Sequence, residues 1–375
     1  MKHLGFCLTI ALSAVASFSS ASGGLLGAWD ITLEDFPRLG NENTDAPRIR
    51  RAIESAGVGG VAYFTRGEYE IDSTVVLTNQ VSLLLHKSAC LKAVKKMPFI
   101  IEYHANEMND GGHEGVIVDH NLFIKGGIFD GNGLASCAVV SGPRHFMLAD
   151  TTYRNGLKVG LQLGYPDKRS GEGGYEIFAN NLYFICNRPG MAGNVGFLTY
   201  IGDSHFTDLV VVDYTVGIRD MKFANRYTRC HVWGGPVRTP GTEISEYLVD
   251  SISFDIAGYG TILTDCYADT AMIGFNISSD ARLFGCSYNN NYRFKMDGPT
   301  CINHIGGELL VYGGFFPKSS PNVTLYRRGE KRGSLIWRDN QLIKFTAEAL
   351  KPIELELKRS AESGHICGDL GRLAD

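Results

Sequence analysis

Short β-like segments recur in the chain at a spacing near 20 residues. Four nine-residue segments align in one register: HFTDLVVVD (205–213), RYTRCHVWG (226–234), ILTDCYADT (262–270) and RLFGCSYNN (282–290). One column of the alignment holds Leu209, Cys230, Cys266 and Cys286, at intervals of 21, 36 and 20 residues. A period of this length, made of short strands and turns, is typical of stacked coils that share one core.

A second repeat lies upstream of three of these segments. It reads GFLTYIGD (196–203), GIRDMKFA (217–224) and GFNISSDA (274–281), with each first glycine 13, 13 and 12 residues before the column residue. Long β connections without helices argue against a doubly wound sheet. An antiparallel sandwich would not repeat one column at this spacing. We therefore expect an all-β solenoid, a parallel β-helix.

The clearest helix candidate is TDAPRIRRAIESAG (44–57). Thr44 or Asp45 can cap it, and Gly57 ends it. Its apolar face would hold Ile49, Ala52, Ile53 and Ala56. The open end of a solenoid exposes unpaired strand edges, so we expect this helix to cap that end.

Alternation along a strand decides which side chains face the core. If Cys230 faces inward, Val232 does too, whereas His231 and Trp233 face outward. The segment TRCHVWGG (228–235) is therefore not a two-ligand metal site. The expected inward columns are Leu209/Cys230/Cys266/Cys286 and Val211/Val232/Ala268/Tyr288. The expected outward columns are Asp208/Arg229/Asp265/Gly285, Val210/His231/Tyr267/Ser287 and Val212/Trp233/Asp269/Asn289.

The first 21 residues, MKHLGFCLTIALSAVASFSSA, have a basic start, a short apolar run and small residues before a cleavage site near Ala21. This pattern predicts a signal peptide and a secreted or periplasmic protein. The apolar run is too short to span a membrane. Beyond it we expect a cap and first coils over 22–77, the parallel β-helix over 78–341, and a C-terminal cap and tail over 342–375.

The charge bears on the possible partners, and the cysteine content bears on disulfides. The formal net charge is −4, and no basic stripe indicates a nucleic-acid partner. Eight cysteines follow the leader, which in an exported protein raises the question of disulfides. Because several lie in apolar strand-like runs, we expect mostly free thiols in the core.

The N-terminal region resembles a known superfamily. Residues 31–77 carry Gly40, Asn43, Thr44 and Asp45 before the helix, then Gly59–Gly60, VAYF, Gly67 and Tyr69. This order resembles the N-terminal module of the pectate-lyase-like superfamily, and LFIKGGIFDGNG (122–133) resembles the coil that follows in polygalacturonases. The resemblance implies a single-stranded right-handed parallel β-helix that binds and cleaves a polysaccharide.

The catalytic motifs of those families are not carried over. The only Asn-Thr-Asp, 43–45, lies at the helix start, no Asp-Asp pair exists, and HIGG (304–307) replaces Gly-His-Gly. Arg293 and Lys295 form Arg-x-Lys without its partners. No string of acidic residues provides a calcium site, so no cofactor or metal is expected, although calcium stays possible.

Candidate catalytic residues come from the outward columns. Asp269 and His231 are the first candidates for acid–base work, followed by Asp265, Asp208 and Arg229. Asp208 and Asp265 lie two coils apart, but Arg229 between them would hold both carboxylates ionised. The structural alternative for these three residues is a surface ion ladder. The candidate sugar-binding residues are Trp233, Tyr267, Tyr183 and Lys222.

Some of these residues could have a structural role instead of a catalytic or sugar-binding one. His231 could be a hydrogen-bonded surface histidine, and the aromatic residues could pack beneath a loop over 235–247. Asp130, with the nearby Asp119 and His120, is expected to shape a coil corner.

We expect a polysaccharide as partner and hydrolysis as the reaction. A lyase that acts on a uronate, with Arg229 or Lys222 neutralising the carboxylate, is one alternative. A non-catalytic glycan-binding or adhesion β-helix is the other. The sequence predicts no oligomeric state.

Overall fold

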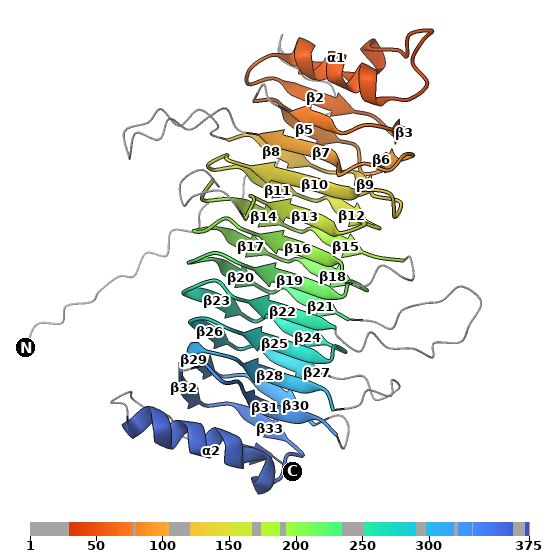
Figure 1. Cartoon of the computed structure of the whole chain (residues 1–375). Coiled ribbons are helices and arrows are strands. Elements are labelled where there is room, and N and C mark those ends of the chain that lie inside the picture. The colour runs from red at the N-terminus through yellow and green to blue at the C-terminus, as the bar shows by residue number, and fades with distance from the viewer. Residues whose placement is uncertain are drawn as a thin grey trace, which may run out of the picture.

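The computed structural model describes residues 30–77, 80–104, 121–166, 174–187, 193–234, 251–289, 298–318, 322–331, 333–362 and 372–374. These form one elongated stack of coils with a helix near each end (Figure 1). The predicted signal peptide, 1–21, lies outside the described residues. No described helix is long and apolar enough to cross a membrane.

Three sheets, all paired in parallel, run along the stack. Sheet A joins β1 (Asp30–Thr32), β2 (Val61–Phe64), β5 (Ser82–Leu85), β8 (Phe123–Lys125), β11 (Met147–Ala149), β14 (Phe178–Asn180), β17 (His205–Thr207), β20 (Arg226–Thr228), β23 (Thr261–Thr264), β26 (Ala281–Phe284), β29 (Gly307–Tyr312) and β32 (Gly333–Arg338).

Sheet B joins β3 (Gly67–Ile71), β6 (Ala89–Ala93), β9 (Ile128–Asp130), β12 (Thr152–Arg154), β15 (Tyr183–Ile185), β18 (Val210–Val212), β21 (His231–Trp233), β24 (Tyr267–Asp269), β27 (Ser287–Asn289), β30 (Phe315–Pro317), β33 (Gln341–Ile343) and β34 (Arg372–Ala374). Sheet C joins β4 (Val75–Leu77), β7 (Phe99–His104), β10 (Ser136–Ser141), β13 (Val159–Leu163), β16 (Val195–Thr199), β19 (Val216–Asp220), β22 (Ile252–Ile256), β25 (Ile273–Ile277), β28 (Thr300–His304) and β31 (Thr324–Arg328).

Each full coil supplies one strand to sheets A, B and C in turn, so the predicted parallel β-helix is confirmed. The predicted register is also confirmed, because Val210 pairs with His231, His231 with Tyr267, and Tyr267 with Ser287. The 36-residue interval between Cys230 and Cys266 therefore leaves the ladder unbroken.

The predicted inward column is buried. Leu209, Cys230, Cys266 and Cys286 are each 0 % exposed, and the three thiols are free. Each follows a residue with a positive φ: Asp208, Arg229, Asp265 and Gly285, at 56°, 53°, 52° and 62°. Aspartate and glycine tolerate this left-handed conformation, and it makes the short corner between sheets A and B.

The glycine repeat allows sheet B side chains to reach deep into the core. A Cβ at Gly217 would lie 2.2 Å from Cγ1 of Val232 and 2.8 Å from the Ser253 carbonyl oxygen. A Cβ at Gly274 would lie 2.5 Å from Cδ2 of Tyr288. The recurring glycine is thus required by close approach across the core.

Helix α1 (Ala46–Ala56) follows the short 3-10 helix η1 (Leu33–Asp35) and contacts β1, β2 and β4. Its predicted apolar face is buried, with Ile49, Ala52, Ile53 and Ala56 at most 3 % exposed. Asp45, one of the two residues expected there, is the N-cap of the helix, but its side chain makes no capping hydrogen bond.

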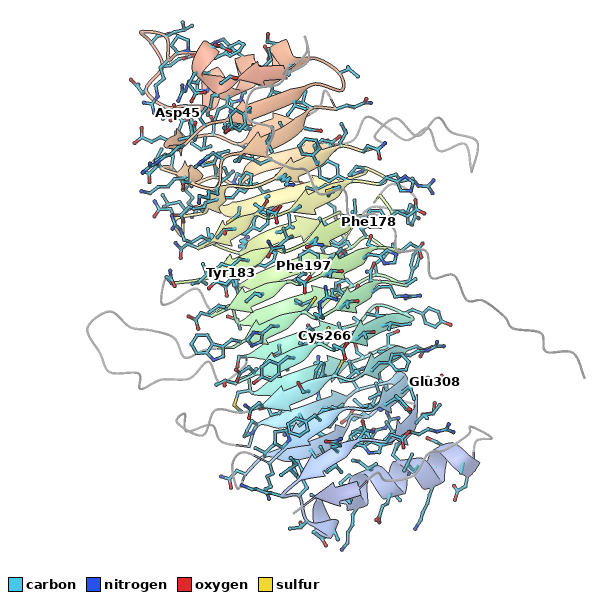
Figure 2. All side chains as sticks on the ribbon, turned by 180° about the vertical axis from the view of Figure 1, so that it is seen from behind. Asp45, Phe178, Tyr183, Phe197, Cys266 and Glu308 are labelled. Carbon is cyan, nitrogen blue, oxygen red and sulfur yellow. The ribbon has the colours of Figure 1, made fainter. Side chains whose placement is uncertain are left out.

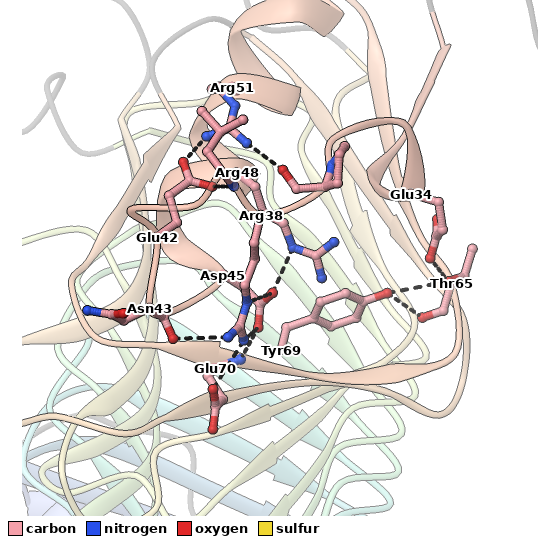
Figure 3. A network of polar contacts seen from close by, with 12 residues as sticks. Glu34, Arg38, Glu42, Asn43, Asp45, Arg48, Arg51, Thr65, Tyr69 and Glu70 are labelled. Atoms are coloured by element: carbon pink, nitrogen blue, oxygen red, sulfur yellow. Dashed lines mark hydrogen bonds and ion pairs between the residues drawn. The ribbon is translucent and has the colours of Figure 1, made fainter.

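The Asp45 carboxylate instead forms the centre of a polar network (Figure 3). It accepts hydrogen bonds from Arg38 Nη2 at 2.6 Å, Arg48 Nε at 2.7 Å and the Glu70 backbone N–H at 2.6 Å. Burial alone would raise the pKa of Asp45, but these donors outweigh it and lower that pKa. Arg48 also lies over the Tyr69 ring, 5.5 Å from its centroid. The Asp45 and Tyr69 of the family-like module therefore join the helix to sheet B.

Helix α2 (Ala347–Glu362) packs on β31 and β32 at the other end. Leu350, Ile353 and Leu357 bury its apolar side. Glu356 is 2 % exposed, and its Oε1 lies 3.5 Å from Nε of Arg328. An ion pair therefore accompanies the apolar contact between helix and sheets.

Replacing Gly217 by Ala is expected to destabilise the protein by about 1–3 kcal/mol, because the new Cβ would overlap Val232 and the Ser253 backbone. Urea unfolding followed by tryptophan fluorescence measures the change. Gly40→Ala is the control, since nothing lies within 4 Å of a Cβ there. Equal midpoints for the two variants would contradict this account of the core.

Candidate functional site

The outward face of sheet B brings together four of the predicted site residues. His231 and Trp233 on β21 pair with Tyr267 and Asp269 on the neighbouring β24. Between them, Val232 and Ala268 point into the core and are at most 1 % exposed. The alternation predicted from the sequence therefore holds, and these four side chains share one half-buried surface.

His231 is held by its neighbours on the next coil. Its ring stacks on that of Tyr267, with centroids 4.7 Å apart and planes 16° apart. Its Nε2 atom is buried, has no hydrogen-bond partner in the described chain, and lies 3.9 Å from Oδ2 of Asp269. That separation is longer than a hydrogen bond. The imidazole is thus oriented toward the carboxylate without being tied to it.

Asp269 and Tyr267 each have a further partner. Thr270 Oγ1 donates to Asp269 Oδ1 at 2.5 Å, and Asn289 Nδ2 donates to Tyr267 Oη at 3.2 Å. Burial raises the pKa of Tyr267, and the Asp269 charge adds to this while the Asn289 bond opposes it. Tyr267 is therefore a neutral hydroxyl at physiological pH, available as a donor.

The outward column through His231 continues in both directions. Beyond Tyr267 lies the small Ser287 and then Phe315, which is 40 % exposed. His231 covers one face of the Tyr267 ring, and Ser287 faces the other. In the opposite direction, Val210 separates His231 from Tyr183, which is 39 % exposed. Figure 2 shows Tyr183 on the outside of the stack, whereas Cys266 belongs to the buried column.

The carboxylates of the A–B corner do not join Asp269. Arg229 Nε and Nη2 donate to the two oxygens of Asp208, at 2.8 and 2.7 Å. Oδ1 of Asp265 lies 2.3 Å from where a Gly285 Cβ would be, so this carboxylate leans over the next coil. Only the first half of the Asp208–Arg229–Asp265 ladder therefore forms an ion pair.

Lys222 lies elsewhere, between β19 of sheet C and β20 of sheet A. Its Nζ is 5.8 Å from the centroid of the Phe223 ring. The structure thus does not bring Lys222 to the sheet B surface.

Asp130 shapes its coil corner as expected. It accepts hydrogen bonds from Arg154 Nη2 at 2.8 Å and from the Asn132 N–H at 2.9 Å. The other polar candidates, Asp119, His120, Arg293 and Lys295, lie outside the described residues, as does the expected covering loop 235–247.

Sequence analysis missed a polar ladder on the outward face of sheet C. Arg219 Nε donates to Asp255 Oδ2 at 2.7 Å, Asn276 Nδ2 to Asp255 Oδ1 at 2.8 Å, and Asn303 Nδ2 to Asn276 Oδ1 at 2.7 Å. The signal was present, because these residues occupy one position of the repeated segments GIRD, SFDI, GFNI and CINH. The aligned segments 217–224 and 274–281 contain Arg219 and Asn276, but the segment with Asp255 between them was not aligned.

A pocket of about 800 Å³ lies beside helix α2. Its charged lining has both signs: Asp280, Glu308, Arg328, Glu330, Lys331, Glu356 and Arg359. Glu308 marks its position on the ribbon (Figure 2). Among the described residues, no group of three or more His, Cys, Asp or Glu side chains could hold a metal ion.

His304 is buried near this pocket. Its Nδ1 lies 2.8 Å from Tyr326 Oη and its Nε2 lies 2.9 Å from the Gly307 carbonyl oxygen. Burial, together with the positive charge of Arg328, lowers the pKa of His304 to about 4. The imidazole is therefore neutral in the folded protein and acts as part of the core.

Comparison with known proteins identifies the fold. No protein-family model and no curated protein matches the sequence. An endo-xylogalacturonan hydrolase from Aspergillus tubingensis matches with a TM-score of 0.55 and 12 % identity, over 92 % of this chain and 100 % of its own. A tailspike protein double mutant of E. coli bacteriophage HK620, in complex with a pentasaccharide, matches with a TM-score of 0.60 and 12 % identity, over 84 % and 62 %.

PfbA, a surface adhesin of Streptococcus pneumoniae, matches with a TM-score of 0.50 and 13 % identity, over 84 % and 86 %. The chain spans about three fifths of the length of two viral chains that it matches and about half of another. At these identities the likeness shows the fold alone. The chain is a right-handed parallel β-helix, which confirms the fold that the family resemblance implied.

The pKa of His304 predicts a pH-dependent stability. Its pKa in the folded protein is below the ordinary value of 6.5, so the unfolded chain takes up a proton first as pH falls. The contribution of neutral His304 to the free energy of unfolding is therefore greatest above pH 6.5. The free energy of unfolding is expected to fall by about 3 kcal/mol between pH 6.5 and 4. Urea unfolding of the wild type and of His304→Gln across this pH range measures the fall. The variant is expected to lack this fall, and an equal fall in both proteins would contradict the assignment to His304.

Proposed function

We propose that this protein is a polysaccharide-acting β-helix that holds its glycan along the outward face of sheet B and hydrolyses it there. The observation that carries the proposal is the arrangement of His231, its Nε2 buried 3.9 Å from the Asp269 carboxylate and its ring stacked on Tyr267. Nearby aromatic and carboxylate groups are the side chains that glycan binding and acid–base chemistry use.

The face is suited to an extended chain because its side chains repeat with the coils, about 4.8 Å apart. One face of Tyr267 lies toward Ser287, where a sugar ring can stack. Trp233 lies on the coil of His231, on the other side of Tyr267, and pairs with Asp269. The Tyr267 hydroxyl and the Asn289 amide, already joined at 3.2 Å, supply polar contacts.

Asp269 is proposed as the group that exchanges a proton with the glycosidic oxygen or with water. Thr270 holds one of its oxygens, and the other faces His231. His231 is proposed as the positioning partner, because an imidazolium there would stabilise the ionised carboxylate between proton transfers. The His231 and Asp269 pair is thus one acid–base unit.

A non-catalytic glycan-binding protein is the second candidate. It is favoured by the absence of a second carboxylate beside Asp269 in the described chain, since Asp208 is paired with Arg229 and Asp265 leans over Gly285. The likeness to a surface adhesin is also compatible with it.

Two further parts of the proposal concern the chain outside the site. The leader-like residues 1–21 support export to the cell surface, periplasm or medium. Helix α1, which contacts β1, β2 and β4, is proposed to cap the first coil and shield its strand edges.

The variant Asp269→Asn is expected to lower kcat/KM for glycan hydrolysis at least 100-fold, because the amide cannot exchange the proton. Appearance of new reducing ends measures the reaction, and an unchanged thermal midpoint shows that the variant is folded. Retention of the glycan by the wild type without any product would favour the binding protein instead.

The variant Ser287→Phe is expected to weaken glycan binding about fivefold to tenfold, because its ring would occupy the free face of Tyr267. Isothermal titration against the same glycan measures the change. Thr228→Phe is the matched control, as Thr228 is a half-buried residue of sheet A in the coil of His231. Equal weakening by both variants would place the glycan elsewhere.

A further inference from the structure

The charged groups of the candidate site indicate which glycans it accepts. Between β15 and β27, the described outward residues of sheet B and of its corner with sheet A include one permanent cation, Arg229. Both oxygens of Asp208 bind it, at 2.8 and 2.7 Å. Its charge is therefore already neutralised when a ligand arrives.

The same surface retains negative charge. Asp269 forms no ion pair with a lysine or arginine of the described chain, and the His231 imidazole lies 3.9 Å from it. The Asp265 carboxylate points away from Arg229, toward Gly285. Asp269 therefore faces a ligand that lies across Tyr267 without a lysine or arginine beside it in the described chain.

The described cations on the neighbouring strands are held in different ways, and Arg282 on β26 is exposed on the separate face of sheet A. On sheet C, Arg219 is paired with Asp255 at 2.7 Å. On sheet A, Arg226 donates to the carbonyl oxygens of Ala224 and Gly260, at 3.0 and 3.3 Å. Further along sheet B, Arg154 is paired with Asp130 at 2.8 Å.

We infer that the sheet B site takes an uncharged glycan and discriminates against polyuronates, an inference that rests on the function proposed above. A uronate carboxylate placed on Tyr267 would meet Asp269, and the described residues of sheet B and its corner offer it no unpaired lysine or arginine. Elimination also requires a uronate, because the proton removed lies next to its carboxylate. The reaction of this site is thus hydrolysis, and its substrate is a chain of neutral sugars.

The test compares neutral and acidic probes of equal length on the full chain. Hexasaccharides of xylose, glucose, galactose and mannose are titrated beside hexagalacturonate at low and at high salt. At least one neutral probe is expected to bind about fivefold or more tightly than hexagalacturonate at low salt, because each like-charge contact costs roughly that factor. High salt is expected to reduce this difference in affinity, because it screens the repulsion between the carboxylates.

Matched variants at Val210, next to His231 in the outward column, test the charge directly. Val210→Lys is expected to strengthen hexagalacturonate binding about fivefold relative to Val210→Gln, with equal neutral binding by both. Tighter binding of hexagalacturonate by the wild type would overturn the inference and leave the proposed glycan function standing. Failure to bind any probe, or binding that Ser287→Phe leaves unchanged, would overturn both.

Discussion

The structure depends on the parallel pairing of each coil with the next. Every full coil places a strand in sheets A, B and C, and residues at equivalent positions lie one above another. A side chain therefore meets its counterparts on the neighbouring coils before it meets anything else. This one constraint produces the buried file of Leu209, Cys230, Cys266 and Cys286, the glycine file across the core, and the outward file through His231 and Tyr267.

The candidate site follows from the same constraint. His231 stacks on Tyr267, and Trp233 pairs with Asp269, because the two strands are adjacent in register. The ion pair of Arg229 and Asp208 likewise forms between equivalent corner positions of adjacent coils. The site is therefore built by stacking, and its chemistry depends on which residue each coil presents at the same two or three positions.

The sequence predicted the fold and much of this arrangement because a solenoid turns spacing along the chain into neighbours in space. The register of 205–213, 226–234, 262–270 and 282–290 was predicted correctly, and so was the opposite orientation of Cys230 and His231. Side-chain direction within a file was not predictable. Whether Asp265 turns toward Arg229 or toward Gly285 depends on local packing and on a left-handed corner, which spacing does not encode.

Other contacts were not predicted from the sequence because they join segments far apart in it. Thr44 or Asp45 was expected to cap helix α1, and Asp45 is the N-cap, but its carboxylate binds Arg38 and the backbone N–H of Glu70, a strand residue 25 positions away. Lys222 was expected to bind the sugar, yet it belongs to the corner between sheets C and A. The sheet C ladder was missed because the segment that carries Asp255 was not aligned with those of Arg219 and Asn276.

The unbroken register across the long interval between Cys230 and Cys266 has a consequence for how such a protein can change. The chain adds some fifteen residues beyond a normal coil after Trp233 without shifting any partner on either side. Insertions at that corner are thus nearly free of consequence for the scaffold, whereas a single-residue slip inside a strand would turn the whole outward file into the core. Diversification of ligand choice can therefore proceed by loop length at fixed architecture.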